Sequence, residues 1–388
     1  MKISIISDFH FGFGTGTERE QDPFDAFSDA LEKSMDSDLI LIGGDVFNTK
    51  VPGTETLIKA MQLLIKPMTT KKSAKITAGL GKNIETLPQT AREGIPIIAI
   101  HGNHERRVKG LMNPVEALEK AGFLIHLHCN GIVIQKGEEK VCIQGISGIP
   151  EQYFSSVMEQ WNPKPMPGCV NIFLLHQILS PFVNFPKTVD INTIPPGFDL
   201  YVCGDLHDTK KLTYSNAPLL ISGSLIPTQL NKESVIPKGF WKVDIQKIGG
   251  KPEIRTDFIE FENQRRVYYI EKDFESSEEI ENEIKHILQE SHKKKPLIRI
   301  KTGDKPFLNE MQTKFEDQAI ISFKKEADEE VLPARSPEEQ RLSVQELGKK
   351  ILKQNLKDSG LDPKLFEDIF ELLLNKKPEK AMELLDKE

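Results

Sequence analysis

Short apolar runs alternate with amphipathic stretches over about the first 260 residues. Residues 22–35 carry Phe24, Phe27 and Leu31 on one side, as an amphipathic helix does. The polar stretch 69–93 predicts an inserted helix and loop. Apolar runs rich in Ile, Leu and Val are typical of strands covered on both faces, and their alternation with helices predicts an α/β domain of layered sheet and helix. The runs are "KISIIS" (2–7), "DLILIGG" (38–44), "IPIIAIHG" (95–102), "VCIQGIS" (141–147), "VNIFLLH" (170–176) and "DLYVCG" (199–204).

The pattern changes after residue 245. Residues 265–274 and 296–303 alternate as strands do, and residues 276–290 between them have the pattern of a capped helix. We expect a small α+β domain over residues 263–327.

A segment rich in Pro and Glu, residues 326–340, predicts a linker. Two amphipathic helices are expected beyond it, over residues 343–356 and 362–375. The second helix has an apolar stripe that fits either packing on the chain's own body or docking into a partner's groove. The stripe consists of Leu365, Phe366, Ile369, Phe370 and Leu373. The predicted domains are therefore 1–262, 263–327 and 328–388.

Composition narrows the class of protein. The 388 residues are 38% hydrophobic, enough for two or three domains with sizeable cores. The four cysteines form no C-x-x-C pair, which argues against a disulfide framework and a structural zinc site. Asp8 and His10 interrupt the N-terminus before a signal-peptide core could form, and no apolar run reaches membrane-spanning length. We expect a soluble cytoplasmic protein with no signal peptide and no membrane partner.

Charge is unevenly distributed along the chain. The net charge of −7 is unlike that of a protein whose whole surface binds nucleic acid. Residues 104–110, 263–266 and 291–301 are locally basic. These runs are either solvated faces or one groove for a polyanion.

Polar side chains recur where predicted strands end. Because open α/β sheets gather ligands at the carboxyl ends of their strands, these side chains are expected to converge. Carboxylates, imidazoles and an amide, without thiolates, suit Mn²⁺, Mg²⁺, Fe²⁺ or Zn²⁺, and their number favours two ions sharing a carboxylate. The residues are Asp8, His10, Asp45, Asn103, His104, Glu105, His176, Asp205 and His207.

These motifs, Asp-x-His, Gly-Asp, Gly-Asn-His-Glu, His and Gly-x-x-His, resemble those of the calcineurin-like binuclear metallophosphoesterases over residues 1–245. The opening segment 7–31 and the closing segment 221–245 further resemble one branch, the SbcD-like (Mre-eleven) DNA double-strand-break repair nucleases. The resemblance implies a layered metallophosphoesterase β-sandwich flanked by helices. It also implies that the small domain is a DNA-capping domain and that the helical C-terminal tail binds an ATPase.

The resemblance assigns a role to each site residue. Asp8, His10 and His207 would hold one ion. Asn103, His176 and residue 205 would hold the other, and Asp45 would bridge. His104 would not be a ligand but would face the phosphate, oriented by Glu105.

Two residues depart from the family's pattern. Asp205 stands where the family usually has His, and we expect it to be a ligand because carboxylate oxygen binds Mn²⁺ or Mg²⁺ well. Asn48 stands where the family often has His near the scissile strand, and it cannot supply a full charge or a titrating proton. Metal-dependent phosphodiester cleavage is therefore better supported than exonuclease action in particular.

The expected function is that of a DNA exonuclease or endonuclease in double-strand-break repair. Two divalent ions, Mn²⁺ in the first instance, would be its cofactors. Its partners would be DNA, an SbcC-like ABC/SMC-type ATPase and a second copy in a homodimer. The resemblance also implies association with the nucleoid. The alternatives are a phosphoesterase acting on a small or protein substrate and a DNA-binding scaffold with a weakened site. The expected DNA contacts are Asn48, Arg106, Arg107, Arg265, Arg266, Lys293, Lys294 and Lys295.

Overall fold

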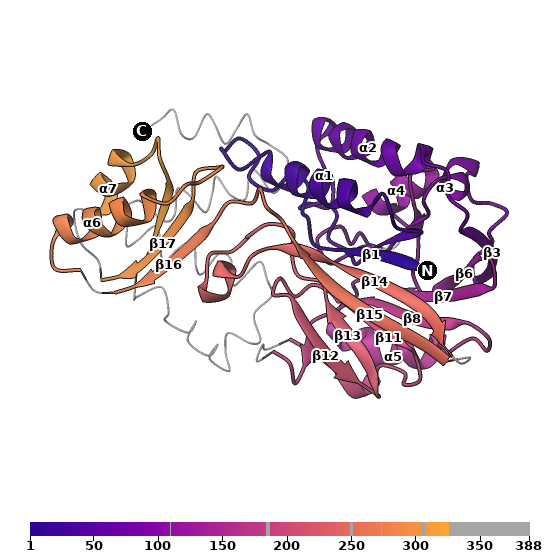
Figure 1. The fold of residues 1–388 in the computed structure, drawn as a ribbon. Helices are drawn as coiled ribbons and strands as arrows, with labels where there is room; N and C mark the ends of the chain where they lie inside the picture. The colour runs from indigo at the N-terminus through magenta and orange to yellow at the C-terminus, as the bar shows by residue number, and fades with distance from the viewer. Residues whose placement is uncertain (109, 184–186, 249–250, 273, 304–307, 326–388) are drawn as a thin grey trace, which may run out of the picture. The chain divides into compact units, whose positions relative to one another are not determined.

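The six apolar runs form strands of two different sheets (Figure 1). The computed structural model describes residues 1–325, apart from residues 109, 184–186, 249–250, 273 and 304–307. The first sheet has six strands in the order β15-β14-β1-β2-β4-β5. Its strands are β1 (Lys2–Ile6), β2 (Leu39–Ile42), β4 (Ile97–Ala99), β5 (Ile125–His126), β14 (Gly239–Ile248) and β15 (Lys251–Glu260).

The second sheet has seven strands in the order β12-β13-β11-β8-β7-β6-β3. Strands β1, β2 and β4 run parallel in the first sheet, and β7, β8, β11 and β13 run parallel in the second. Both sheets therefore present several carboxyl ends at one edge. The strands of the second sheet are β3 (Lys75–Leu80), β6 (Asn130–Lys136), β7 (Glu139–Ile146), β8 (Val170–His176), β11 (Leu200–Gly204), β12 (Lys210–Tyr214) and β13 (Ala217–Ile221).

The two sheets pack face to face around a buried apolar core. Leu39 and Leu41 of β2 belong to the same cluster as Ile172 of β8, whereas Ile40 and Ile42 belong to a second cluster on the other face of the sheet. Successive strand residues point to opposite faces, so a strand that is apolar throughout is covered on both sides. The expected layered sandwich is confirmed.

Helices cover the outer face of each sheet. Helices α1 (Asp22–Ser34), α2 (Thr54–Thr69) and α4 (Pro114–Lys120) contribute to the apolar cluster on the first sheet, and α5 (Glu151–Trp161) to the cluster on the second. The expectation for residues 69–93 is partly wrong, because they contain strand β3 as well as the short helix α3 (Gln89–Glu93). The pattern of β3 is exposed at every other position, which gives it little hydrophobic signal. Two further short strands, β9 (Leu179–Ser180) and β10 (Val189–Asp190), form a separate pair.

The region expected to be a small α+β domain contains the predicted strands and helix. A three-stranded sheet in the order β16-β17-β18 packs with two helices around a separate apolar cluster. Its elements are β16 (Val267–Glu271), α6 (Ser277–Leu288), β17 (Leu297–Thr302), α7 (Leu308–Lys314) and β18 (Ile320–Lys325). The Ser276 side chain accepts a hydrogen bond from the Glu279 backbone N–H at 3.3 Å, which caps α6 as the sequence indicates. The domain limits at 262 and 327 stay predictions. The linker and the helices expected over 343–356 and 362–375 lie outside the described residues.

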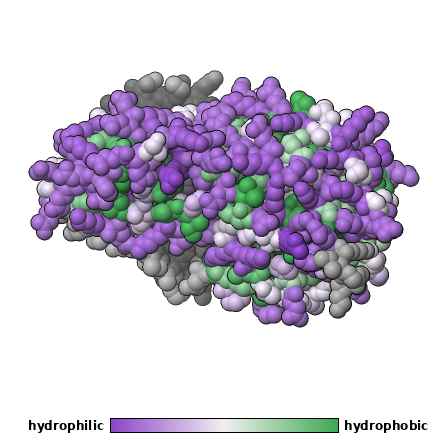
Figure 2. Space-filling view, in the orientation of Figure 1, coloured by the Kyte–Doolittle hydropathy of each residue, from purple (hydrophilic) through white to green (hydrophobic). Residues whose placement is uncertain are grey.

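The surface shown in Figure 2 is mostly hydrophilic, and its hydrophobic residues lie in small separate groups. Among the helices of the described residues, none combines the length and the apolar character needed to cross a bilayer.

Candidate metal centre

Four of the expected ligands have a left-handed backbone. The φ angles are 51° at Asp8, 51° at His10, 48° at Asp45 and 82° at Asp205. Such angles are unusual for residues other than glycine and occur where the surrounding structure holds them, often at functional sites. The Asp8 N–H donates to the Gly44 carbonyl at 3.0 Å and the His10 N–H donates to the Asp45 carbonyl at 3.0 Å. The turns that follow β1 and β2 therefore hold each other in this conformation.

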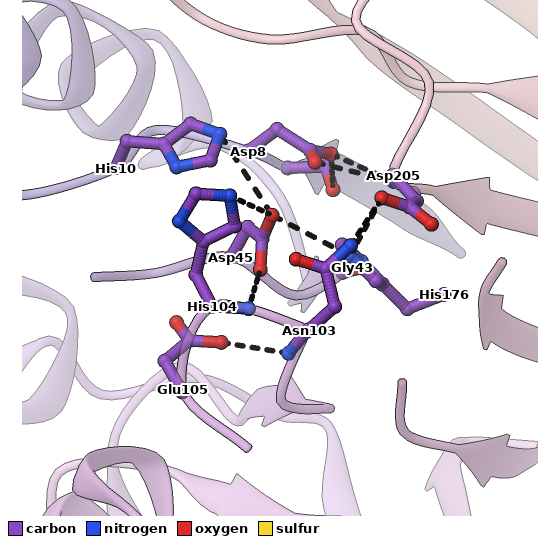
Figure 3. Close-up of polar contacts among 12 residues, drawn as sticks. Asp8, His10, Gly43, Asp45, Asn103, His104, Glu105, His176 and Asp205 are labelled. Carbon is purple, nitrogen blue, oxygen red and sulfur yellow. Dashed lines mark hydrogen bonds and ion pairs between the residues drawn. The ribbon is translucent and has the colours of Figure 1, made fainter. Parts of the chain in front are cut away.

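The ligand atoms converge in two groups that share one carboxylate (Figure 3). Atoms of Asp8, His10, Asp45 and His207 lie within 4.8 Å of one another, and so do atoms of Asp45, His176 and Asp205. In the first group Nε2 of His10 lies 3.1 Å from Nε2 of His207. In the second, Nε2 of His176 lies 3.6 Å from Oδ2 of Asp45.

The second nitrogen of two histidines is engaged outside the groups. His176 Nδ1 donates to the Gly43 carbonyl at 2.7 Å, and His207 Nδ1 lies 2.7 Å from the Thr228 hydroxyl. Histidines that bind metal usually make such a bond with the nitrogen that does not ligate, which fixes the tautomer and the ring. Both rings consequently present Nε2 to the cluster.

Asn103 joins the second group through its amide, which donates to Asp205 Oδ1 at 2.7 Å. Gly102 beside it allows a close approach, because a Cβ there would overlap Asp45 Oδ1. The Gly-Asn-His-Glu motif therefore needs its glycine to bring the Asn103 loop against Asp45.

The pKa values of the buried carboxyl groups indicate that the cluster binds cations. Burial raises the pKa of the Asp8 and Asp205 carboxyls, and nearby Asp45 adds to the effect. Burial also acts to raise the pKa of Asp45, but the charge of nearby His176 outweighs it and the pKa is lowered. Three carboxylates so close together are costly to ionise unless positive charge lies between them.

Buried nitrogen atoms point to the same conclusion. Burial lowers the pKa of His10 to about 3, so its ring is a neutral donor of a lone pair. His176 Nε2, although buried, has no hydrogen-bond partner among the described residues. Buried polar atoms are normally paired. Imidazoles and carboxylates, without thiolate, match divalent cations, so the residues fit the metal ions that the sequence predicts.

His104 lies at the open side of the cluster. Its side chain is 41% exposed, whereas those of Asp8, His10, Asp45 and His176 are at most 1% exposed. His104 Nδ1 hydrogen-bonds the Asn48 carbonyl at 3.0 Å, and its N–H donates to Asp45 Oδ1 at 3.1 Å. A substrate can therefore meet the cluster from the side that His104 occupies.

The expectation that Glu105 orients His104 is wrong. Glu105 is fully buried, and its two oxygens accept hydrogen bonds from the backbone N–H groups of Phe47 and Gly102, each at 2.7 Å. Burial and the charge of Asp45 raise the pKa of Glu105 to about 8. Glu105 thus ties together the two loops that carry Asp45 and Asn103, and the Asn48 carbonyl is the group that orients His104.

Arg265, one of the expected DNA contacts, is occupied by the protein itself. Its Nε lies 2.7 Å from Asp22 Oδ2, and its Nη atoms donate to the carbonyls of Lys295 and Glu18 at 3.0 and 2.9 Å. Only 10% of its side chain is exposed. The guanidinium fastens the entry of the small domain to the start of α1 and has little left to offer a phosphate.

The lysine run is paired in the same way. Lys294 Nζ lies 2.7 Å from Asp25 Oδ2, and Lys295 Nζ lies 2.8 Å from Glu18 Oε1. Lys293 donates to the amide oxygen of Asn263 at 2.8 Å. The sequence of the basic run could not indicate its acidic partners, Asp25 and Glu18, because they lie more than 200 positions earlier in the chain.

The other expected DNA contacts form fewer bonds within the protein. Arg107 donates only to the Lys50 carbonyl, at 3.4 Å, and no acid pairs with Arg106, Arg107 or Arg266 within the described part of the chain. Asn48 contributes its backbone carbonyl rather than its side chain to the site. Two further residues, Thr228 and Lys238, hold the His207 loop. Both lie in the closing segment 221–245, but no local pattern signalled their contacts with His207.

Comparison with known proteins gives the family. The model of the calcineurin-like phosphoesterase family matches residues 1–209. The double-strand break repair protein MRE11 of Mus musculus is 25% identical over 279 residues, 61% of this chain and 38% of that protein. The DNA double-strand break repair protein Mre11 of Methanopyrus kandleri is 25% identical over 302 residues, 72% of this chain and 61% of its own length.

The chain thus matches about two fifths of the length of the first relative and about three fifths of the length of the second. A solved structure described as an archaeal phosphodiesterase is similar over 67% of this chain and all of its own, at 12% identity and a TM-score of 0.30. The family model covers more than half of the chain and ends just beyond His207. The chain belongs to the calcineurin-like phosphoesterase family.

Proposed function

We propose that the chain is a nuclease that hydrolyses phosphodiester bonds of DNA in double-strand-break repair, with two divalent ions, Mn²⁺ first among them. The observation that carries the proposal is the pair of ligand groups that share Asp45. Membership of a phosphoesterase family supports the reaction class. The names of the relatives, which are double-strand break repair proteins, support DNA as the substrate.

The proposed ligands follow the two groups. Asp8, His10 and His207 hold one ion, Asn103, His176 and Asp205 hold the other, and Asp45 contributes to both. Asn103 takes part through its amide oxygen, which requires its side chain to present that oxygen instead of the NH₂ group now facing Asp205. Two bound divalent ions supply a water of lowered pKa and positive charge for the phosphoryl oxygens.

His104 performs the proton chemistry in this proposal. Its Nδ1–H donates to the Asn48 carbonyl, which fixes the partly exposed ring with Nε2 3.9 Å from Asp45 Oδ2 at the edge of the cluster. A proton on Nε2 would neutralise charge that develops on the phosphate or pass to the leaving oxygen. Glu105 acts only at a distance, by holding the loop that carries His104.

Two alternatives make different demands. A phosphoesterase for a small substrate needs the same cluster but has no use for the small domain of residues 263–327. A scaffold with a weakened site would bind DNA without cutting it, and Asp205 and Asn48 are the departures that motivate it. The burial and convergence of Asp205 with His176 favour a working ligand over a disabled site.

The test compares wild type with His104→Ala on linear and hairpin DNA in the presence of Mn²⁺ or Mg²⁺. His286→Ala, at an exposed position of α6, is the matched control. Loss of a general acid lowers the rate by about 10²–10⁴-fold. Equal DNA cleavage by His104→Ala and wild type would refute the role of His104. Hydrolysis of a small chromogenic diester without any DNA cleavage would favour the first alternative, and DNA binding without either reaction would favour the second.

The partners are also proposals. An SbcC-like ABC/SMC-type ATPase would bind the two amphipathic helices expected beyond residue 342, so deletion of residues 343–388 abolishes copurification and leaves diester hydrolysis intact. Homodimer formation is supported by exposed apolar side chains on and before α2, namely Val51, Ile58 and Ile65. Ile58→Glu then shifts the mass measured by light scattering from dimer to monomer.

A further inference from the structure

Lys238 is a buried lysine beside the metal cluster. It precedes β14, only 5% of it is exposed, and its ammonium Nζ donates to the His207 carbonyl at 2.9 Å. A buried ammonium is expensive to desolvate, and one hydrogen bond to a backbone carbonyl, together with the charges of Asp208 and Asp8, offsets only part of that cost. Its place therefore calls for an explanation beyond the stability of the fold.

His207 is held at three points. Thr228 bonds its ring at Nδ1 at 2.7 Å, and its carbonyl accepts from the Ser224 N–H at 3.2 Å and from Lys238 Nζ at 2.9 Å. The ring contact sets the rotation of the imidazole, whereas the two contacts to the carbonyl set the position of the backbone. Because His207 follows β11 in a short loop, a shift of that backbone moves Nε2 relative to His10.

Lys238 is itself fixed by Gln264. The Gln264 Oε1 accepts from the Lys238 N–H at 2.6 Å, and its Nε2 donates to the Lys238 carbonyl at 3.2 Å. Gln264 stands next to Arg265, the residue that fastens the entry of the small domain to Asp22. Gln264 and Lys238 thus link the entry of the small domain to His207 through consecutive hydrogen bonds.

We propose that Lys238 is a positioning residue that holds His207 for the ion of the Asp8–His10–Asp45–His207 group. Gln264 extends this support to the entry of the small domain. The inference deepens the proposed function and rests on it for the assignment of that group as a metal site.

The charge and the hydrogen bond of Lys238 have opposite effects on metal binding. The ammonium repels a divalent cation bound nearby, so if only its charge mattered, its removal would tighten binding. If the bond to the His207 carbonyl matters, its removal weakens binding, because partners that orient a ligand are worth about 10–100-fold in metal affinity. The direction of the change therefore separates the two roles.

The experiment measures Mn²⁺ binding to metal-free protein by calorimetry and by electron paramagnetic resonance, together with the melting temperature without metal. Lys238→Met keeps the length of the side chain and removes the donor. Lys242→Met is the matched control, since Lys242 lies nearby in β14 and pairs with Asp36 at the surface. Gln264→Ala tests the second step of the path and keeps the ammonium.

We expect Lys238→Met to weaken one of the two ions about 10–100-fold and to leave the other unchanged, with Gln264→Ala weakening the same ion to a smaller extent. Lys242→Met binds both ions as wild type does. If the wild type binds two ions and Lys238→Met binds both with unchanged or higher affinity, this inference is overturned and the proposed function is not. Equal weakening of both ions also overturns it, because that is the effect of general destabilisation. Failure of the wild type to bind two ions overturns the proposed function itself. If Lys238→Met does not fold, Gln264→Ala decides by the same criteria.

Discussion

Replacing Glu105 by Gln tests whether the two loops of the centre depend on one buried carboxyl group. Glu105 accepts from the Phe47 and Gly102 N–H groups with different oxygens, each at 2.7 Å. Glutamine has the same shape but offers one oxygen, so its NH₂ group must face one of the two N–H donors. The substitution therefore breaks one of the two bonds and leaves a buried donor unpaired.

The size of the effect follows from these two bonds. A hydrogen bond contributes about 0.5–1.5 kcal/mol, and an unpaired buried N–H costs about 1–3 kcal/mol. Since relaxation of the loops recovers part of this, we expect a loss of about 2 kcal/mol in the free energy of unfolding. For a domain of roughly 250 residues, a loss of about 2 kcal/mol lowers the melting temperature by about 4–8 °C. The loops of Asp45 and His104 also separate, and misplacement by about 1 Å can cost a reaction about 100-fold.

The assay combines thermal unfolding followed by circular dichroism with hydrolysis of a chromogenic diester under Mn²⁺. Glu119→Gln is the matched control, because Glu119 is also a buried acid but bonds Lys82 and the His126 N–H, outside the metal-ligand groups. We expect both variants to lose stability and only Glu105→Gln to lose activity at a temperature where both are folded. Unchanged activity in Glu105→Gln, or an equal loss in Glu119→Gln, would refute the reasoning.

Three further substitutions test other parts of the centre and its surroundings. Asp205→Ala should lose one of two metal ions, because a ligand of the Asp45–His176 group disappears, and full occupancy by metal analysis would contradict the assignment. Asn48→Ala should keep diester hydrolysis within about threefold of wild type, since the carbonyl that orients His104 belongs to the backbone; a loss as large as that of His104→Ala would show that its side chain acts. Arg265→Met should speed limited proteolysis near residues 263–266 by removing the bonds to Asp22 and two carbonyls, and should leave diester hydrolysis intact; an unchanged cleavage rate would mean that the fastening is not needed.

Much of the fold could be predicted because its signals are local. The central strands are mostly apolar on both faces, as strands covered on both sides are, and β2 divides its side chains between two cores. Strand β3 escaped because its alternating, half-exposed residues resemble those of a loop. Its place at the edge of the second sheet depends on pairing with β6, more than 50 residues later.

For the site, the sequence could predict which residues meet but not how each is held. Ligands at successive strand ends converge because parallel strands share an edge, and the spacing of the motifs shows this. The left-handed backbone of Asp8 and Asp45 and the partners of Glu105 depend on contacts between distant loops. No local pattern distinguishes a Glu that orients a neighbouring side chain from one that ties two loops together.

The local charge of the sequence was the least reliable guide to the residues that contact DNA. The salt dependence of DNA binding tests which basic residues make such contacts. Lys294 and Lys295 are neutralised by acids near the start of α1, whereas no acid pairs with Arg106, Arg107 or Arg266 within the described residues. Each phosphate contact contributes about −0.9 to the slope of log K against log salt.

Neutralising Arg106 and Arg107 to Gln should therefore make that slope shallower by about 2, whereas neutralising Lys294 and Lys295 should change it by less than about 0.5 and lower the melting temperature instead. Fluorescence anisotropy with labelled duplex DNA between 50 and 200 mM salt, in Ca²⁺ to prevent cleavage, gives the slopes. The reverse order would mean that DNA displaces Glu18 and Asp25 from the lysines. The acidic start of α1 would then compete with the substrate rather than hold the small domain.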